Sequence, residues 1–130
     1  MTRSQLLWLP ISLLLLAACI TLGIMLGWGA TGVIFAAAVL PDISLIGAFA
    51  TEGKLKPQRV RLYNFLHAVT LPSGLALIGC VVAASTQDFT ALLFALAWFT
   101  HIAVDRACGY RLREPDGSIR PERIKKVVAP

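Results

Sequence analysis

The chain has 130 residues, the length of one domain, but 57% of them are hydrophobic and the mean hydropathy is +0.74, well above soluble globular usage. The net charge of +5 comes from basic residues that flank apolar segments, and seven of the twelve lie from Arg106 onward. This distribution favours orientation in an anionic bilayer over nucleic-acid binding, so the sequence excludes an ordinary soluble domain and predicts a membrane protein.

Apolar stretches predict four transmembrane helices, because each is close to the ~20 residues that cross a ~30 Å hydrocarbon core. The segment "GWGATG" between the first two is short enough for only a tight turn, and Pro72 predicts a kink in the third. We therefore expect an all-α, polytopic membrane protein: a compact bundle over residues 1–113 and a short basic tail over 114–130. The expected spans are residues 6–26, 28–50, 60–84 and 89–108.

The connecting segments predict the orientation. Arg3, the segment "TEGKLKPQRVR" and the tail are basic, whereas "GWGATG" has no charge and "STQD" carries only an acid. By the positive-inside rule, both termini and the middle loop are expected in the cytoplasm.

One alternative concerns the N-terminus. The apolar run that ends "LLAAC" at Cys19 resembles a bacterial lipoprotein signal, in which the cysteine is acylated after cleavage. The next residues, "ITLGIML", remain apolar where a lipoprotein turns polar, and cleavage would remove a span. An uncleaved first helix is the better interpretation.

The three cysteines also lie within or at the edge of apolar segments. They show no CxxC spacing, which indicates neither a disulfide framework nor a zinc knuckle. We expect Cys19, Cys80 and Cys108 to behave as small hydrophobic residues.

Five strongly polar side chains interrupt these apolar spans. Counting 1.5 Å per residue from the expected helix ends places all five in the cytoplasmic half of the membrane. Two pairs are spaced i, i+3 and i, i+4, so each pair shares a helix face. Because an ionisable group facing lipid costs several kcal/mol, we expect them to turn inward and form one cluster. The five are Asp42, Asn64, His67, His101 and Asp105.

Structural roles are available for each residue taken singly. Asp42 after Pro41 can cap or break a helix, His67 can be a neutral histidine bonded to a carbonyl, and Asp105 with Arg106 can end the last span at the interface. Arg106 is expected there, reaching toward lipid phosphate or neutralising an acid. The coincidence of five polar residues in one layer nevertheless favours a functional site.

Two histidines and two carboxylates form a sufficient ligand set for a divalent transition metal such as zinc or manganese. The candidate ligands are Asp42, His67, His101 and Asp105, with Asn64 and Arg106 as further candidate site residues. A metal there would lower the pKa of a bound water, which could attack an ester or phosphoester. Without a metal, the same groups could relay protons, as His and Asp chains do in transporters.

The segments "LPDIS", "YNFLH" and "HIAVDRACGYRLR" resemble the signature of a family of small four-helix bacterial membrane proteins known only as a domain of unknown function. The resemblance covers about residues 6–113 and implies a location in the bacterial inner membrane. It departs at the end, where "YRLREPDGSIRPERIKK" replaces a family pattern that includes a tail histidine. The family's polar positions would be Pro41, Asp42, Ser44, Tyr63, Asn64, His67, His101, Asp105, Arg106, Gly109 and Tyr110.

A weaker similarity is to membrane-bound metal-dependent hydrolases, which combine a Pro-Asp in one helix, a histidine in the next and a later HxxxD. Asp42, His67, His101 and Asp105 would correspond, but the H-x-x-x-T-H-S segment of those proteins is absent. This likeness is an analogy of pattern, and it does not carry function.

Three hypotheses remain open. The leading one is a metal-dependent hydrolase that acts on a lipid-linked or amphipathic substrate, with membrane lipids as its neighbours. The second is a proton-coupled carrier component, expected to be a homo-oligomer because four short helices enclose little volume. The third is a structural or partner-binding protein, in which the small-residue run "GATGVIFAAAV" packs helices closely and the basic tail contacts anionic lipid or another protein.

Overall fold

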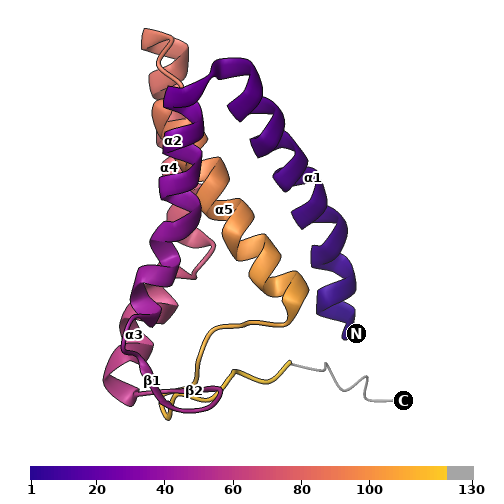
Figure 1. The fold of residues 1–130 in the computed structure, drawn as a ribbon, viewed down its shortest axis with the longest axis vertical. Helices are drawn as coiled ribbons and strands as arrows, with labels where there is room; N and C mark the ends of the chain where they lie inside the picture. Colours follow the sequence, from indigo (N-terminus) through magenta and orange to yellow (C-terminus); the bar gives the residue numbers. More distant parts are fainter. Residues whose placement is uncertain (123–130) are drawn as a thin grey trace, which may run out of the picture.

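The computed structural model describes residues 1–122, and within them four helical segments are long and apolar enough to cross a membrane. They form one helical bundle, with a small two-stranded sheet at one end (Figure 1). This confirms the prediction of an all-α, multi-pass membrane protein. Residues 123–130 of the expected basic tail lie outside the described residues.

Helix α1 (Arg3–Leu26) and helix α2 (Trp28–Val39) meet at a sharp corner. Thr2 and Gln5 form a reciprocal capping box at the start of α1, which satisfies two of its free N–H groups. At its end, Gly27 adopts φ +84°, a conformation that glycine reaches without steric cost. The chain therefore reverses within a single residue, as the short connecting segment predicts.

Helix α2 ends earlier than the predicted residue 50. Pro41 has no N–H to donate, and the chain tightens into the 3₁₀ helix η1 (Leu40–Leu45), which Ser44 closes by donating to the Pro41 carbonyl at 2.7 Å. After Gly47 the chain forms the hairpin of β1 (Phe49–Thr51) and β2 (Lys54–Leu55), in antiparallel pairing. The prediction of helix over residues 46–50 is wrong, because Pro41 and Gly47 stop the helical ladder.

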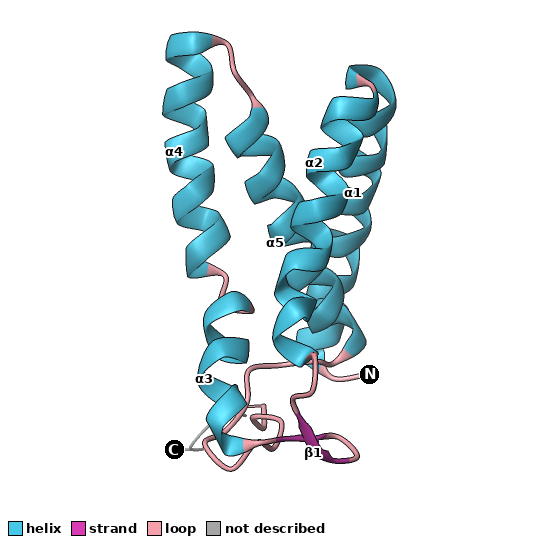
Figure 2. Cartoon of the chain, turned by 60° about the vertical axis from the view of Figure 1, so that its left-hand side comes forward, coloured by secondary structure: helices cyan, strands magenta, loops and turns pink. Residues whose placement is uncertain are grey.

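The third span is broken into two helices. Helix α3 (Pro57–Leu66) ends just before His67, and helix α4 (Thr70–Thr86) begins three residues later (Figure 2). Pro72 removes one backbone donor, and its ring crowds the carbonyl four residues earlier, at Ala68. The third span is thus disrupted, as Pro72 predicts, but the disruption is a complete break beside His67, one turn before the proline.

Helix α5 (Thr90–Cys108) is the centre of the bundle, because α1, α2 and α4 all pack against it. Its buried residues include Ala97, which joins Cys19 of α1 and Ala37 of α2 in one cluster. Gly79 of α4 lies directly against the α5 backbone, and a Cβ there would be 2.7 Å from the Leu92 nitrogen. Small residues thus allow the close helix packing that is typical of membrane proteins.

The N-terminus, the hairpin and residues 110–122 gather at the same end of the bundle, opposite the α1–α2 corner (Figure 1). An isolated bridge pairs Arg113 with Ile119, and the Leu55 amide donates to the Gly117 carbonyl at 3.1 Å. The segment after α5 is therefore folded against the hairpin. The cellular compartment at this end of the bundle stays a prediction.

Candidate metal centre

Four predicted site residues come together from three parts of the fold: the 3₁₀ helix η1, the residue after α3, and helix α5. Asp42 lies in η1, His67 follows the last residue of α3, and His101 and Asp105 lie one turn apart on α5. The 3₁₀ turn at Pro41 and the break after Leu66 bring the first two residues toward the central helix. The same local breaks that shorten the helices thus position the site.

The imidazole Nε2 atoms face both carboxylates. His67 Nε2 lies 3.5 Å from Asp105 Oδ2 and 4.0 Å from Asp42 Oδ1. His101 Nε2 lies 3.6 Å from each of the same two oxygens. Each imidazole Nε2 atom therefore lies within 4.0 Å of one oxygen from each carboxylate.

The orientation of the His67 ring is fixed by its neighbours. Its Nδ1 is 2.9 Å from the Tyr63 carbonyl oxygen, which can only accept, so Nδ1 carries the hydrogen. The Tyr63 ring stacks on the imidazole with 3.9 Å between centroids and 18° between planes. This leaves the lone pair of Nε2 directed at the carboxylates, which is the arrangement that metal-bound histidines use.

Distances at the site fit a shared ion better than direct hydrogen bonds. Neither His67 Nε2 nor His101 Nε2 has a hydrogen-bond partner among the described residues, although both atoms are buried. Their separations from the carboxylate oxygens, 3.5–4.0 Å, exceed the usual N–H···O length of about 2.9 Å. Two ligand atoms that each lie ~2.1 Å from a tetrahedral ion are ~3.4 Å apart, close to the observed spacing.

Asp42, His67 and His101 form the tightest group, with one ligand atom from each lying within 4.8 Å of the others. The His67 side chain is 1% exposed and that of His101 is 12% exposed, whereas the Asp42 side chain is 53% exposed. The site is thus closed on the histidine side and open beside Asp42. A ligand would enter along the open side.

The break before α4 frees two carbonyl groups, and α5 supplies donors for both. Trp98 Nε1 donates to the Leu66 carbonyl at 2.8 Å, and Arg106 Nη2 donates to the His67 carbonyl at 2.9 Å. Irregular backbone inside a membrane needs such partners, because the hydrocarbon offers none. These two side chains therefore hold the His67 segment against α5.

Two predicted site residues are directed elsewhere. Asn64 forms paired hydrogen bonds with the Arg113 main chain, donating to its carbonyl at 2.9 Å and accepting from its amide at 2.7 Å. Arg106 neutralises no acid in the described part of the chain: it binds the carbonyls of His67 and Tyr110. The expectation that Asn64 belongs to the cluster is wrong, because its amide satisfies the backbone of the folded tail.

Sequence reasoning gave no role to Trp98, which lies within the expected span over residues 89–108, or to Arg113. Arg113 is 3% exposed, lies over the Tyr63 ring at 5.4 Å and donates to the Gly53 carbonyl. Pro72 was the available signal for the helix break, and a broken helix requires a donor such as Trp98. Nothing in the local sequence indicates that the tail returns to Asn64.

Fold and site together define a small multi-pass membrane protein with a His/Asp cluster that could hold a metal ion. The domain of unknown function DUF4260 matches residues 7–120, and the chain belongs to this family. The resemblance of the three motifs to an uncharacterised membrane family is thereby confirmed. No curated protein and no solved structure matches the chain in these comparisons.

Proposed function

We propose that the protein is a metal-dependent hydrolase of the bacterial inner membrane, with the sheet end of the bundle in the cytoplasm. Its ion, zinc or manganese, is held by His67, His101 and Asp42. The observation that carries the proposal is the pair of buried Nε2 atoms that find no hydrogen-bond partner within residues 1–122. They face carboxylate oxygens at the spacing of ligands to a common ion.

Three protein ligands leave a coordination position for water, which is the arrangement of catalytic rather than structural sites. A bound divalent ion would lower the pKa of that water to near neutrality. Asp105 Oδ2 faces both imidazoles at 3.5 and 3.6 Å and is placed to accept a proton at this point. Tyr63 and the Tyr63 carbonyl orient His67, while Arg106 fixes the backbone that carries it.

The position of the opening supports an amphipathic substrate. Asp42 is half exposed near the end of its span, where a group at the level of the lipid headgroups can approach. Apolar side chains surround the helices above it, so a lipid-like tail could remain in the bilayer. An ester or phosphoester at the head of such a molecule would meet the site.

The experiment is metal analysis and hydrolysis assays on the full chain, purified in detergent with an affinity tag that contains no histidine. The His67→Ala, His101→Ala and Asp42→Asn variants should lose the metal and any activity on lipid phosphoesters. Asp105→Asn should retain the metal and lose activity. Glu52→Gln, an exposed acid in the hairpin turn, is the matched control and should change neither. Metal retained in both histidine variants would contradict the proposal.

A second candidate, a proton-coupled carrier, is supported by the helix break at His67, because transporters place ion sites at discontinuous helices. It predicts pH-dependent flux in proteoliposomes that Asp42→Asn abolishes, in protein that contains no metal. Flux and metal content measured on the same preparations therefore separate the two candidates.

A further inference from the structure

A polar cavity lies at the end of the bundle, between the start of α1 and the segment after α5. Its volume is about 320 Å³, and it is separate in its lining from the His/Asp cluster. Its lining includes Ser4, Trp8, Arg106, Arg111, Arg120 and Glu122. Three of these side chains carry guanidinium groups. They lie where the first span begins, at Arg3, and where the last span ends, at Cys108, which is the level of the membrane surface.

The arginines are only partly neutralised. Arg111 pairs with Glu122 at 3.2 Å and Arg120 pairs with Glu114 at 3.0 Å. Arg106 has no ion pair with a carboxylate among residues 1–122, and its two terminal nitrogens donate to main-chain carbonyls. Because the lining carries three positive charges and one negative charge, the cavity keeps a net positive potential.

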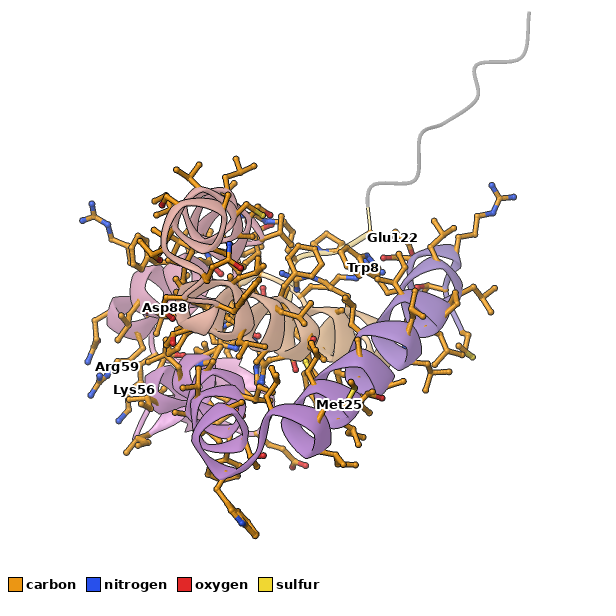
Figure 3. All side chains as sticks on the ribbon, turned by 90° about the horizontal axis from the view of Figure 1, so that it is seen from above. Trp8, Met25, Lys56, Arg59, Asp88 and Glu122 are labelled. Carbon is orange, nitrogen blue, oxygen red and sulfur yellow. The ribbon has the colours of Figure 1, made fainter. Side chains whose placement is uncertain are left out.

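A carboxylate of the chain itself already occupies part of this cavity. One oxygen of Glu122 accepts from the Ser4 amide at the start of α1 at 3.1 Å, and the other faces Arg111. The hydrogen bond from Arg111 holds the pKa of Glu122 below its usual range, so the group is ionised at neutral pH. Figure 3 shows Glu122 beside Trp8, away from the exposed Lys56 and Arg59. The Glu122 contacts thus outline a place for an anion, with the Ser4 amide and the Arg111 guanidinium as donors.

We propose that this cavity binds the phosphate of an anionic headgroup, with Arg111 and Arg106 as its principal contacts and Glu122 as an internal competitor. Arginine suits phosphate because its planar fork can donate two hydrogen bonds to it. Trp8 lies where tryptophan is favoured, at the boundary between acyl chains and headgroups. Basic pockets between membrane helices are known sites for phosphate-bearing lipid heads.

The proposal is tested by titrating the full-length protein in neutral detergent and following complexes by native mass spectrometry. The probes are phosphatidylglycerol, phosphatidylcholine and inorganic phosphate. We expect saturable binding of phosphatidylglycerol that is about tenfold weaker in Arg111→Gln, since one charge-assisted hydrogen bond is lost. Glu122→Gln removes the competing charge and should bind several-fold tighter. Arg59→Gln removes an equal charge outside the cavity and should bind as the wild type does.

The control probes identify the source of the phosphate. Binding of inorganic phosphate with the same dependence on Arg111 and Glu122 would assign the cavity to free phosphate, whereas binding of the lipid alone would assign it to a headgroup. Equal losses in Arg111→Gln and Arg59→Gln, no tightening in a folded Glu122→Gln variant, or no saturable binding by wild type would overturn the proposal. Metal content, measured in the same samples, should not change in Arg111→Gln, so this result is independent of the His/Asp site.

Discussion

Arg106 donates a hydrogen bond of 2.9 Å to the main-chain carbonyl of His67, across the gap between α5 and the broken third span. The carbonyl would otherwise be unsatisfied in a membrane environment, because α4 begins only at Thr70. This contact joins the last turn of α5, which also carries Asp105, to the histidine of the candidate metal centre. The helix break and the site are therefore one structural unit.

Replacing Arg106 with lysine tests this unit. Lysine keeps the charge, but it lacks the planar fork that reaches the carbonyls of His67 and Tyr110 together. We expect Arg106→Lys to lower metal affinity about tenfold, the usual scale for loss of an outer partner of a metal ligand. Competition with a chelator of known affinity measures it. Arg61→Lys, at an exposed position of α3, is the control. An equal loss of metal affinity in that variant would show that the Arg106 guanidinium does not support the site.

The Trp98 indole makes the companion contact to the Leu66 carbonyl. Phenylalanine retains most of the ring volume but removes the N–H, leaving the carbonyl without its donor. We expect Trp98→Phe to reduce the stability of the folded protein by about 1–3 kcal/mol. The thermal midpoint in detergent should fall. Trp8→Phe is the matched change, since no hydrogen bond of the Trp8 indole is found in the described part of the chain, and it should have the smaller effect.

Asn64 holds the returning chain segment through its paired bonds to Arg113. Aspartate in its place can still accept from the Arg113 amide but cannot donate to the carbonyl. Asn64→Asp should therefore expose residues 110–122 to proteolysis sooner than wild type, while the metal content stays unchanged. Loss of metal with an intact tail would instead return Asn64 to the ligand cluster.

The link between the hairpin and the tail should respond to acid in a defined range. Hydrogen bonds from Ser118 and from Lys54 hold the pKa of Asp116 far below its usual range. The carboxylate is thus favoured in the fold, so its contribution is present above the ordinary pKa of about 3.9 and is lost as pH falls toward the lower folded value. The contribution of Asp116 to stability should therefore be constant between pH 8 and 5. Comparing wild type with Asp116→Asn over pH 7 to 3 should show the difference shrinking below about pH 4.

Hydropathy and charge predicted the membrane class and the number of spans well, because both follow from composition over about 20 residues. The same reasoning failed at the ends of α2 and α3. Pro41 and Pro72 were visible in the sequence, but whether a proline bends, tightens or breaks a helix depends on which donors lie nearby. At the break between α3 and α4, Trp98 and Arg106 supply those donors, and they are distant in sequence from the carbonyls that they satisfy.

The candidate site was predicted in its essentials because burying an ionisable group without partners is costly, which forces such groups together. The four ionisable residues lie close together, as their common depth in the membrane predicts: Asp42, His67, His101 and Asp105. Asn64 does not, since an amide is uncharged and a backbone segment satisfies it equally well. Helix spacing placed Asn64 and His67 on one face, but His67 lies beyond the last residue of α3, where helical spacing no longer applies.

Elemental analysis of the purified protein, either untagged or with a tag that contains no histidine, decides whether His101 is a metal ligand. Transition metal is measured per chain in wild type, His101→Ala and Glu52→Gln. We expect near-stoichiometric zinc or manganese in wild type and in Glu52→Gln, and none in His101→Ala. A folded wild-type protein that takes up no metal after incubation with either ion, or a His101→Ala variant that keeps its metal, would show that the His/Asp cluster is not a metal centre.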